Sequence, residues 1–497
     1  MQVLYNSTRG GEKGLTSSQA ILNGLAGDGG LYVPDSFPTL EVSLDELAGM
    51  SYQELAWEVM KLFLTDFTEE ELRSCINHAY DSKFDVPEIA PLVHKDGAWF
   101  LELFHGRTIA FKDMALSILP YLMTTAARKN HITNKICILT ATSGDTGKAA
   151  MAGFADVPGT EIIVFFPKDG VSPVQKKQMV TQKGKNTHVV AITGNFDDAQ
   201  TGVKKMFGDR KLAEDAAARE IQFSSANSIN IGRLVPQAAY YVYAYAQLLK
   251  QGVIRAGDPI NITVPTGNFG NILAAYYAKQ IGLPVKKLIC ASNENNVLTD
   301  FFTTGTYDKN RPFILTTSPS MDILVSSNLE RLIYLISGED AAKTSSLMAS
   351  LREGGKYEIT DSMKEGLADF YAGYATEKEV AGTIGRIHAE CGYVIDPHTA
   401  VAATVYHRFR EETGDDTPAV IASTASPYKF ARAVLHSIDA EKYDAMTDME
   451  QFDALHEVSG VKIPAAIEEI KTAPVRHKTV SSVEDMQKTV RDILGID

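Results

Sequence analysis

The sequence has little cysteine, and none of it is spaced for metal binding. Its 497 residues include four cysteines, none in a C-x-x-C pair. Cys137 and Cys290 lie in apolar runs of the kind that form buried strands. The eleven histidines include no H-E-x-x-H motif, so we expect no metal site. Scattered thiols without a disulfide pattern are typical of a reducing compartment, and we expect a cytoplasmic protein.

Long hydrophobic runs and an excess of basic residues are also missing. No stretch approaches the roughly 18 apolar residues of a membrane span. The N-terminus lacks the charged-then-apolar pattern of a signal peptide. The formal net charge of −14 disfavours nucleic acid as a partner, because phosphate backbones bind to basic faces. A small phosphorylated ligand is not excluded, since it needs only a local pocket of donors.

The length and the element pattern predict more than one domain, because a chain of this size exceeds one hydrophobic core. Residues 1–91 carry helical periodicities without a strand–glycine–helix unit, and we expect a separate, mostly helical N-terminal domain there. Further along, strand and helix patterns alternate, as in α/β proteins with parallel sheets covered on both faces. The expected strands include residues 135–140, 161–166, 187–193, 260–264, 286–290 and 419–422.

Two glycine-rich turns follow predicted strands, at the edge where such sheets bind ligands. They are Thr142-Ser143-Gly144-Asp145-Thr146-Gly147 and Gly267-Asn268-Phe269-Gly270-Asn271. Both leave backbone N–H groups at the start of a helix, where a carboxylate or phosphate can bind. An ordinary strand-to-helix loop has the same composition, so neither turn decides the function alone. The first turn is not a P-loop, because that motif needs four residues between its glycines and a hydroxyl where Ala149 stands.

Lys112 precedes both turns. A primary amine can form an imine, and an amine with two anion-binding turns supplies the parts that a pyridoxal phosphate (PLP) site requires. The alternative is a solvated lysine beside an apolar helical face, which begins at Phe111 and runs to Met123. Pro120 lies inside this face, so the helix is expected to be kinked there or to start late.

Taken together, motifs along nearly the whole chain resemble the long form of the threonine synthase family, within the fold-type II PLP-dependent enzymes of the tryptophan synthase β-like kind. The segments that carry the resemblance are 31–34 (LYVP), 111–113 (FKD), 140–147 (TATSGDTG), 171–179 (VSPVQKKQM), 265–271 (PTGNFGN), 320–323 (SMDI), 327–331 (SNLER), 396–400 (DPHTA) and 423–430 (STASPYKF). Two positions depart from the family: Ser426 stands where histidine is frequent, and Asn271 where aspartate or glutamate is.

The resemblance implies an α/β fold with two doubly wound domains behind the smaller N-terminal domain. The catalytic region would cover residues 92–497, with a smaller mobile domain at about 130–245 and a larger one at about 92–129 plus 246–497. It also implies a PLP-dependent carbon–oxygen lyase acting on phosphates. Such an enzyme converts O-phospho-L-homoserine and water to L-threonine and phosphate, the last step of threonine biosynthesis.

The resemblance also implies roles for individual residues. Lys112 would carry PLP and act as the catalytic base, Phe111 would pack beside the cofactor, and the Thr424 hydroxyl would meet the pyridine nitrogen. The phosphate of the cofactor would lie in the second turn, on Gly267, Asn268, Phe269, Gly270 and Asn271. The substrate carboxylate would lie in the first turn, on Thr142, Ser143, Gly144, Asp145 and Thr146. Lys429, Arg107 and Arg331 are candidates for the substrate phosphate, which as a dianion needs a cation.

Two other functions share most of these features. A threonine or serine dehydratase of the same fold would use the same lysine and glycine turn without a second phosphate site. A synthase-like protein could bind phosphorylated metabolites without turning them over. For every alternative we expect a small-molecule ligand and a monomer or homodimer, with neither nucleic acid nor membrane as partner.

Overall fold

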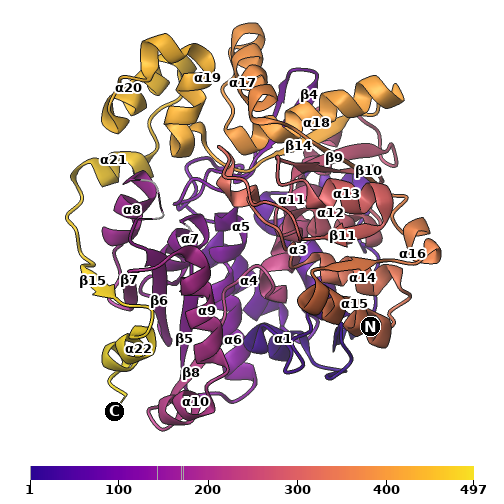
Figure 1. Ribbon diagram of the computed structural model, residues 1–497. Coiled ribbons are helices and arrows are strands. Elements are labelled where there is room, and N and C mark those ends of the chain that lie inside the picture. Colours follow the sequence, from indigo (N-terminus) through magenta and orange to yellow (C-terminus); the bar gives the residue numbers. More distant parts are fainter. Residues whose placement is uncertain (1, 143, 170, 172, 497) are drawn as a thin grey trace.

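The computed structural model describes residues 2–142, 144–169, 171 and 173–496. Two open sheets lie side by side, each covered by helices, and the N-terminal region packs against them (Figure 1). None of the described helices is both long and apolar enough to cross a membrane.

The N-terminal region is mostly helical. Its elements are β1 (Tyr5–Ser7), β2 (Tyr32–Pro34), α1 (Ser17–Asn23), α2 (Leu44–Leu47), α3 (Tyr52–Phe63) and α4 (Glu69–Ala79). Each of the four helices begins with a capping box, such as Ser51 with Glu54, in which two otherwise unpaired N–H groups are satisfied. Helix α3 packs on α11 (Ile231–Lys250), and Tyr52 meets Tyr243 edge to face at 5.2 Å. The region therefore shares an apolar core with the rest of the chain.

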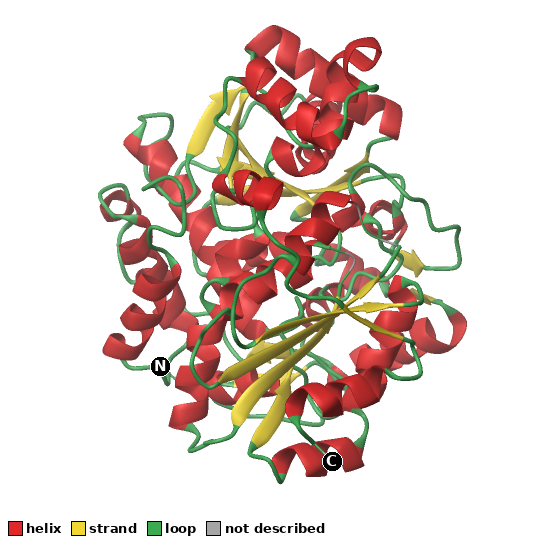
Figure 2. Cartoon of the chain, turned by 90° about the vertical axis from the view of Figure 1, so that its left-hand side faces the viewer, coloured by secondary structure: helices red, strands yellow, loops and turns green. Residues whose placement is uncertain are grey.

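The smaller sheet has five parallel strands in the order β15-β7-β6-β5-β8. They are β5 (Lys135–Ala141), β6 (Thr160–Pro167), β7 (Thr187–Ile192), β8 (Ile221–Ser224) and β15 (Thr479–Ser481). Its helices are α7 (Asp145–Phe154), α8 (Pro173–Val180), α9 (Phe196–Phe207), α10 (Arg210–Ala217) and α22 (Met486–Leu494). Figure 2 shows this sheet in the foreground, with helices on both sides.

The larger sheet has the order β13-β10-β9-β14-β4-β3, and only β3 runs antiparallel to its neighbour. The strands are β3 (Leu92–Lys95), β4 (Ala98–Glu102), β9 (Ile260–Pro265), β10 (Val285–Ser292), β13 (Phe370–Tyr374) and β14 (Ala419–Ser423). A separate ladder joins β11 (Thr306–Asp308) to β12 (Lys356–Glu358). The remaining helices are α5 (Lys112–Leu116), α6 (Leu119–Lys129), α12 (Gly270–Gln280), α13 (Val297–Thr304), α14 (Leu329–Ile336), α15 (Ala341–Gly354), α16 (Asp361–Glu365), α17 (Glu377–Cys391), α18 (Pro397–Thr413), α19 (Ala431–Tyr443), α20 (Asp448–Ser459) and α21 (Ala465–Thr472), with short 3₁₀ turns η1 (Pro319–Met321) and η2 (Pro427–Phe430).

The expected strands are all present, within one or two residues of their expected ends. Pro120 lies in the first turn of α6, so the apolar face from Phe111 to Met123 is split between α5 and α6, as the proline predicts. One placement departs from the expected division of the chain. Strand β15, assigned by sequence to the larger domain, pairs with β7 at the edge of the smaller sheet.

Candidate active site

Lys112 is the first residue of α5, and the backbone before it is fixed to the segment that follows β14. The Phe111 N–H donates to the Thr424 carbonyl at 2.8 Å, and the Ser426 N–H donates to the Ile109 carbonyl at 3.0 Å. Ile109 adopts a left-handed φ of 53°, which turns the chain into the helix. These contacts place the backbone of Phe111 and Lys112 beside that of Thr424, and the roles of the three residues stay predictions.

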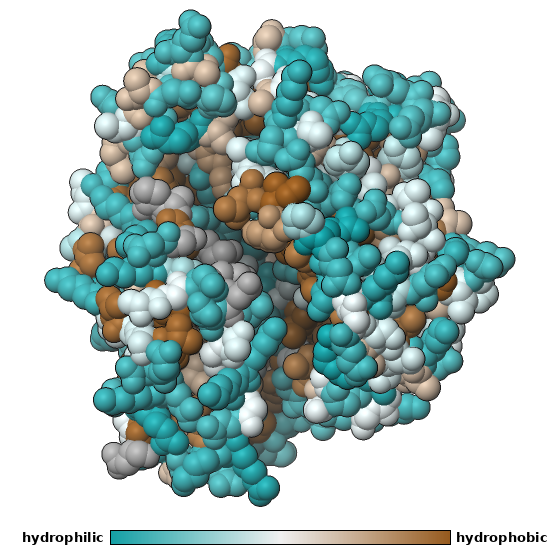
Figure 3. All heavy atoms as spheres, viewed as in Figure 1, coloured by the Kyte–Doolittle hydropathy of each residue, from teal (hydrophilic) through white to brown (hydrophobic). Residues whose placement is uncertain are grey.

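The Lys112 amine is buried among polar groups from several elements. Its Nζ donates to Ser320 Oγ of η1 at 3.1 Å and lies 3.7 Å from Asp145 Oδ2 of α7. Asp145 Oδ1 lies 3.1 Å from the Nζ of Lys429, which belongs to η2 and is itself fully enclosed. Two lysines from the larger sheet's side therefore share one carboxylate from the smaller sheet's side. Figure 3 shows a hollow in the surface between these two halves.

Burial and neighbouring charges set the protonation of this cluster. Burial lowers the pKa of Lys112, Asp145 opposes this, and Lys429 and Arg233 add to it, so that the pKa is about 8. For Asp145, burial raises the pKa of the carboxyl, but Lys429 and Lys112 lower it more, and the net pKa is well below its usual range. A lysine of this kind is partly a free amine near neutral pH, as a nucleophile or base requires.

The second glycine-rich turn presents unpaired N–H groups. Among the described residues, no acceptor takes the N–H groups of Asn268, Phe269 or Gly270, and α12 has no side-chain cap. Phe269 has a left-handed φ of 65°, while the Asn268 carbonyl accepts the Asn328 N–H at 3.0 Å and so faces α14. The turn therefore has donors but no partner, which fits a phosphate. Asn271 points elsewhere: its Oδ1 accepts the hydroxyls of Tyr240 and Tyr241.

The first turn satisfies part of its own backbone. Thr142 Oγ1 accepts the N–H groups of Gly144 at 2.9 Å and Gly147 at 3.0 Å. Asp145 and Thr146 begin α7, and the Asp145 carboxylate also accepts from Gln175 at 3.1 Å. Ser143 lies outside the described residues. The substrate-carboxylate role of this turn stays a prediction.

The three cations proposed for the substrate phosphate lie in different surroundings. Arg107 is exposed. Arg331 is buried and donates to the Tyr32 carbonyl at 2.8 Å, to the Ile229 carbonyl and to Asn328 Oδ1. Lys429 lies in the cluster and donates to the Thr108 carbonyl at 3.0 Å as well as to Asp145. Their roles stay predictions.

Arg233 was missed by sequence reasoning. It lies in the first turn of α11 and is 3% exposed, and no carboxylate of the described residues pairs with it. Among the described residues, its side chain has one hydrogen bond, from Nη1 to the Ala226 carbonyl at 3.1 Å, and its Nε has no partner. Burial lowers the pKa of Arg233 to about 10. The available signal was a single charge in the otherwise uncharged stretch 229–249, because buried arginines are rarely left unpaired.

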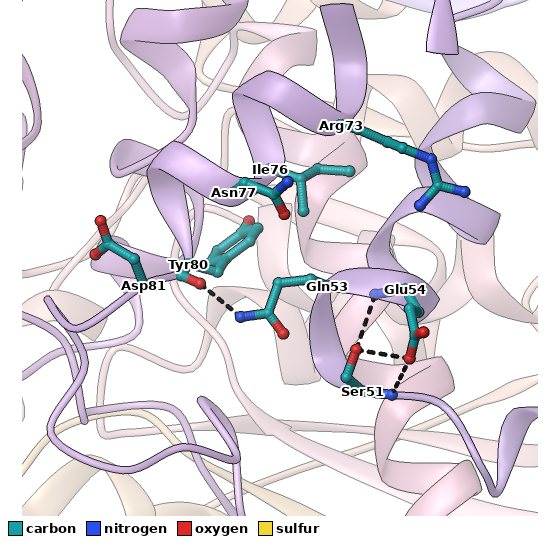
Figure 4. Close-up of a pocket in the computed structure, with 8 residues that line it drawn as sticks. All are labelled: Ser51, Gln53, Glu54, Arg73, Ile76, Asn77, Tyr80 and Asp81. Atoms are coloured by element: carbon teal, nitrogen blue, oxygen red, sulfur yellow. Dashed lines mark hydrogen bonds between the residues drawn. The ribbon is translucent and has the colours of Figure 1, made fainter. Parts of the chain in front are cut away.

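A groove of about 460 Å³ lies elsewhere, between α3 and α4 (Figure 4). Several of its polar groups already have partners: Glu54 accepts the Ser51 N–H at 2.8 Å, and Arg73 pairs with Glu69 at 2.7 Å. None of the predicted site residues lines it. The cluster around Lys112 therefore stays the candidate site.

Comparisons with known proteins agree with this geometry. Residues 4–80 match the family model described as threonine synthase N terminus, residues 84–424 that of pyridoxal-phosphate dependent enzymes, and residues 399–493 that of the threonine synthase C-terminal region. The chain is 37% identical to threonine synthase of Schizosaccharomyces pombe, covering 91% of this chain and 93% of the relative. It is 39% identical to human threonine synthase-like 1, covering 88% of this chain but spanning only 60% of that relative's length.

Solved structures give the same result. The crystal structure of PLP-bound threonine synthase from Brucella melitensis superposes with a TM-score of 0.86 at 35% identity, over 99% of both chains. The yeast threonine synthase structure has a TM-score of 0.87 at 31% identity, again over 99% of both chains. The expected α/β architecture of PLP fold type II is thereby confirmed, and this chain belongs to the threonine synthase family of pyridoxal-phosphate dependent enzymes.

Proposed function

We propose that this chain is a threonine synthase, converting O-phospho-L-homoserine and water to L-threonine and phosphate. The observation that carries the proposal is a pair of buried groups: the Lys112 amine and the Arg233 guanidinium, which has no carboxylate partner among the described residues. A dehydratase needs the first of these but has no substrate phosphate for the second.

The residues present fit PLP. Lys112 would hold the cofactor covalently, and the N–H groups of Asn268, Phe269 and Gly270 would hold its phosphate. The Thr424 hydroxyl has no hydrogen-bond partner among the described residues, and the Thr424 carbonyl accepts the Phe111 N–H, so this hydroxyl would meet the ring nitrogen. When bound, PLP supplies an electron sink for carbanions next to the amino group.

Lys112 is the proposed base. A buried amine with a pKa of about 8 can take the proton from the substrate Cα and return it further along the substrate. Asp145 holds the Lys112 and Lys429 amines together across the two halves. Closure of the halves would exclude water until phosphate has left.

Arg233 is the proposed ligand of the substrate phosphate. Its charge contributes to lowering the pKa of Lys112, and α11, which carries Arg233, packs on α5, which begins with Lys112. A buried guanidinium without a carboxylate is costly unless an anion binds it. The phosphate dianion of O-phospho-L-homoserine meets this need.

Phosphate release distinguishes the candidate functions. We expect the purified protein with PLP to release phosphate and form threonine from O-phospho-L-homoserine. Turnover of L-threonine or L-serine to a keto acid at a higher kcat/KM would instead identify a dehydratase. Binding of O-phospho-L-homoserine without turnover would identify a non-catalytic binding protein.

Substitutions of the two turn glycines should separate packing from cofactor binding. A Cβ on Gly267 would lie 2.6 Å from the Ser320 carbonyl oxygen, whereas one on Gly270 meets Asn328 Nδ2 at 3.4 Å. We expect Gly267→Ala to destabilise the ligand-free chain by about 1–3 kcal/mol, and Gly270→Ala to leave it nearly unchanged. Both should bind PLP less tightly. Thermal melts with and without PLP measure this, and an unchanged PLP affinity of Gly270→Ala would contradict the phosphate site.

Substitution of Thr424 should have a smaller effect on PLP affinity. Thr424→Val removes one neutral hydrogen bond at nearly constant volume, so PLP affinity should fall about tenfold or less. Thr424→Asp should bind PLP but divert substrate to keto acid, because a carboxylate favours a protonated ring nitrogen. The measurements are the PLP dissociation constant and the ratio of threonine to keto acid. Wild-type values for Thr424→Asp would show that this side chain does not face the ring.

The lowered pKa of Lys112 predicts a pH profile for cofactor uptake. Only the free amine forms an imine, so the second-order rate of PLP uptake should rise about tenfold per pH unit below pH 8. Above about pH 8 it should level off. Nα-acetyl-lysine provides the control, since its rate should keep rising to about pH 10. A protein profile that follows the control would show an unperturbed lysine.

We also propose a cytoplasmic location, supported by cysteines that are all free and mostly buried. For assembly we propose a monomer or a homodimer, which light scattering distinguishes.

For the domains, we propose that residues 1–91 precede a catalytic region at 92–497. The smaller part of that region, at about 130–245, also includes β15 and α22 from the C-terminal end of the chain.

A further inference from the structure

The loop of residues 316–322, here called the Ser320 loop, reaches the active site from a polar anchor. Thr316 donates through its N–H and hydroxyl to Asp322 at 3.0 and 2.7 Å. Asn293, at the end of β10, donates to Asp322 at 2.8 Å and to the Ser318 hydroxyl at 3.0 Å. The loop's base is therefore fixed by hydrogen bonds, and Ser320 lies in η1 on the side of Lys112.

Ser320 has three contacts in the site. Its hydroxyl accepts from Lys112 Nζ at 3.1 Å and donates to Asp145 Oδ2 at 3.2 Å. Its backbone N–H donates to His398 Nε2 at 3.1 Å. The carbonyl of the same residue lies where a Cβ on Gly267 would clash. Ser320 thus contacts the lysine and packs on the glycine turn.

His398 is held in one tautomer. Because Nε2 accepts the Ser320 N–H, the ring proton must be on Nδ1, which donates to Asp396 Oδ2 at 2.6 Å. Asp396 is fully buried and caps α18 by accepting the Thr399 N–H at 3.1 Å. The imidazole is 3% exposed and packs against Phe430. Burying a carboxylate to orient a histidine costs free energy, so we expect this pair to have a function.

We infer that His398, oriented by Asp396, is a positioning residue that holds the Ser320 hydroxyl against the Lys112 amine. For this role, the side chain at position 398 must accept the Ser320 N–H with an atom at the position of Nε2. The inference rests on the proposed function of Lys112. It adds the residue that orients the hydroxyl in contact with the Lys112 amine.

The inference can be tested on the ligand-free full chain through the ionisation of Lys112. The charged and titratable groups that face this amine are Asp145 of α7, Lys429 of η2 and Arg233 of α11. Ser320 adds a neutral acceptor, which stabilises the ammonium form. Loss of that contact should therefore lower the pH at which Lys112 is half deprotonated.

The experiment compares two amides at position 398. In His398→Gln the side-chain oxygen reaches about as far as Nε2 and can accept the Ser320 N–H. In His398→Asn the amide reaches only the Nδ1 position, so the contact with Asp396 is kept but that with Ser320 is lost. Lys112 is labelled with acetic anhydride at several pH values after removal of PLP with hydroxylamine. Mass spectrometry of the Lys112 peptide gives the midpoint of labelling.

We expect the midpoint to fall by about half to one pH unit in His398→Asn and in Ser320→Ala, the value of one hydrogen bond. It should stay near wild type in His398→Gln and in Thr317→Ala, which removes an exposed hydroxyl of the same loop. The double variant His398→Asn/Ser320→Ala should shift no further than either single one. An unchanged midpoint in Ser320→Ala, or equal shifts in the Gln and Asn variants, would overturn the inference. The Ser320→Ala arm decides if the position-398 variants do not fold, and none of these readouts requires turnover.

Discussion

Lys112→Ala should leave a folded protein with no covalently attached PLP and no measurable threonine formation. The amine is the proposed site of attachment and the proposed base, and no neighbouring group can replace both roles. The fold should survive, because Asp145 keeps its ion pair with Lys429 at 3.1 Å. Absorbance, borohydride reduction and far-UV circular dichroism measure the three expectations.

Lys148→Ala is the matched control for Lys112→Ala. Lys148 follows the first glycine-rich turn, and burial lowers its pKa to about 8 as well. It donates to Gln182, however, and not to the Ser320–Asp145 cluster. The control variant should keep a borohydride-reducible imine. If Lys112→Ala kept that imine and Lys148→Ala lost it, the assignment of the lysine would be wrong.

Arg233→Met should lower kcat/KM for O-phospho-L-homoserine at least about 100-fold, mostly through KM. Removing one partner of a buried, charge-assisted contact typically costs about 2–5 kcal/mol. In the ligand-free chain the same change should be neutral or stabilising, since it removes a buried charge without a carboxylate partner. PLP affinity should change little. The measurements are steady-state kinetics and denaturant unfolding without ligand.

Arg107→Met is the control, because this exposed residue was a rival candidate from the sequence. It should change neither stability nor KM by more than about twofold, as most surface substitutions have small effects. A large loss of kcat/KM in Arg107→Met with wild-type kinetics in Arg233→Met would transfer the phosphate site to Arg107. A destabilised ligand-free Arg233→Met variant would show that the guanidinium is a structural group.

Local patterns determined most of the fold in advance. The strands that lead into the glycine-rich turns are short, nearly all apolar and bounded by turn residues, so the sequence predicts them well. Pro120 predicted the break before α6 for a purely local steric reason. The pairing of β15 with β7 could not be predicted, since Thr479 and Val190 are far apart in sequence and β15 has only three residues.

The residues of the candidate site also differ in how well the sequence predicts them. Lys112 and the second glycine-rich turn are recognisable because their chemistry depends on residue type and local backbone. The proposed roles of Arg233 and His398 depend on groups brought near by tertiary packing, whereas their sequence context shows an ordinary helix start. The one local signal for Arg233 is its single charge in an otherwise uncharged stretch, and no local pattern shows that His398 faces Ser320.

The central claim is that PLP is bound through Lys112. The most direct measurement is borohydride reduction of the purified holoprotein, followed by proteolysis and mass spectrometry of every lysine-containing peptide. We expect one pyridoxyl group per chain, on Lys112. A pyridoxyl group on Lys148 or Lys429, or a protein that takes up PLP without any reducible bond, would contradict it.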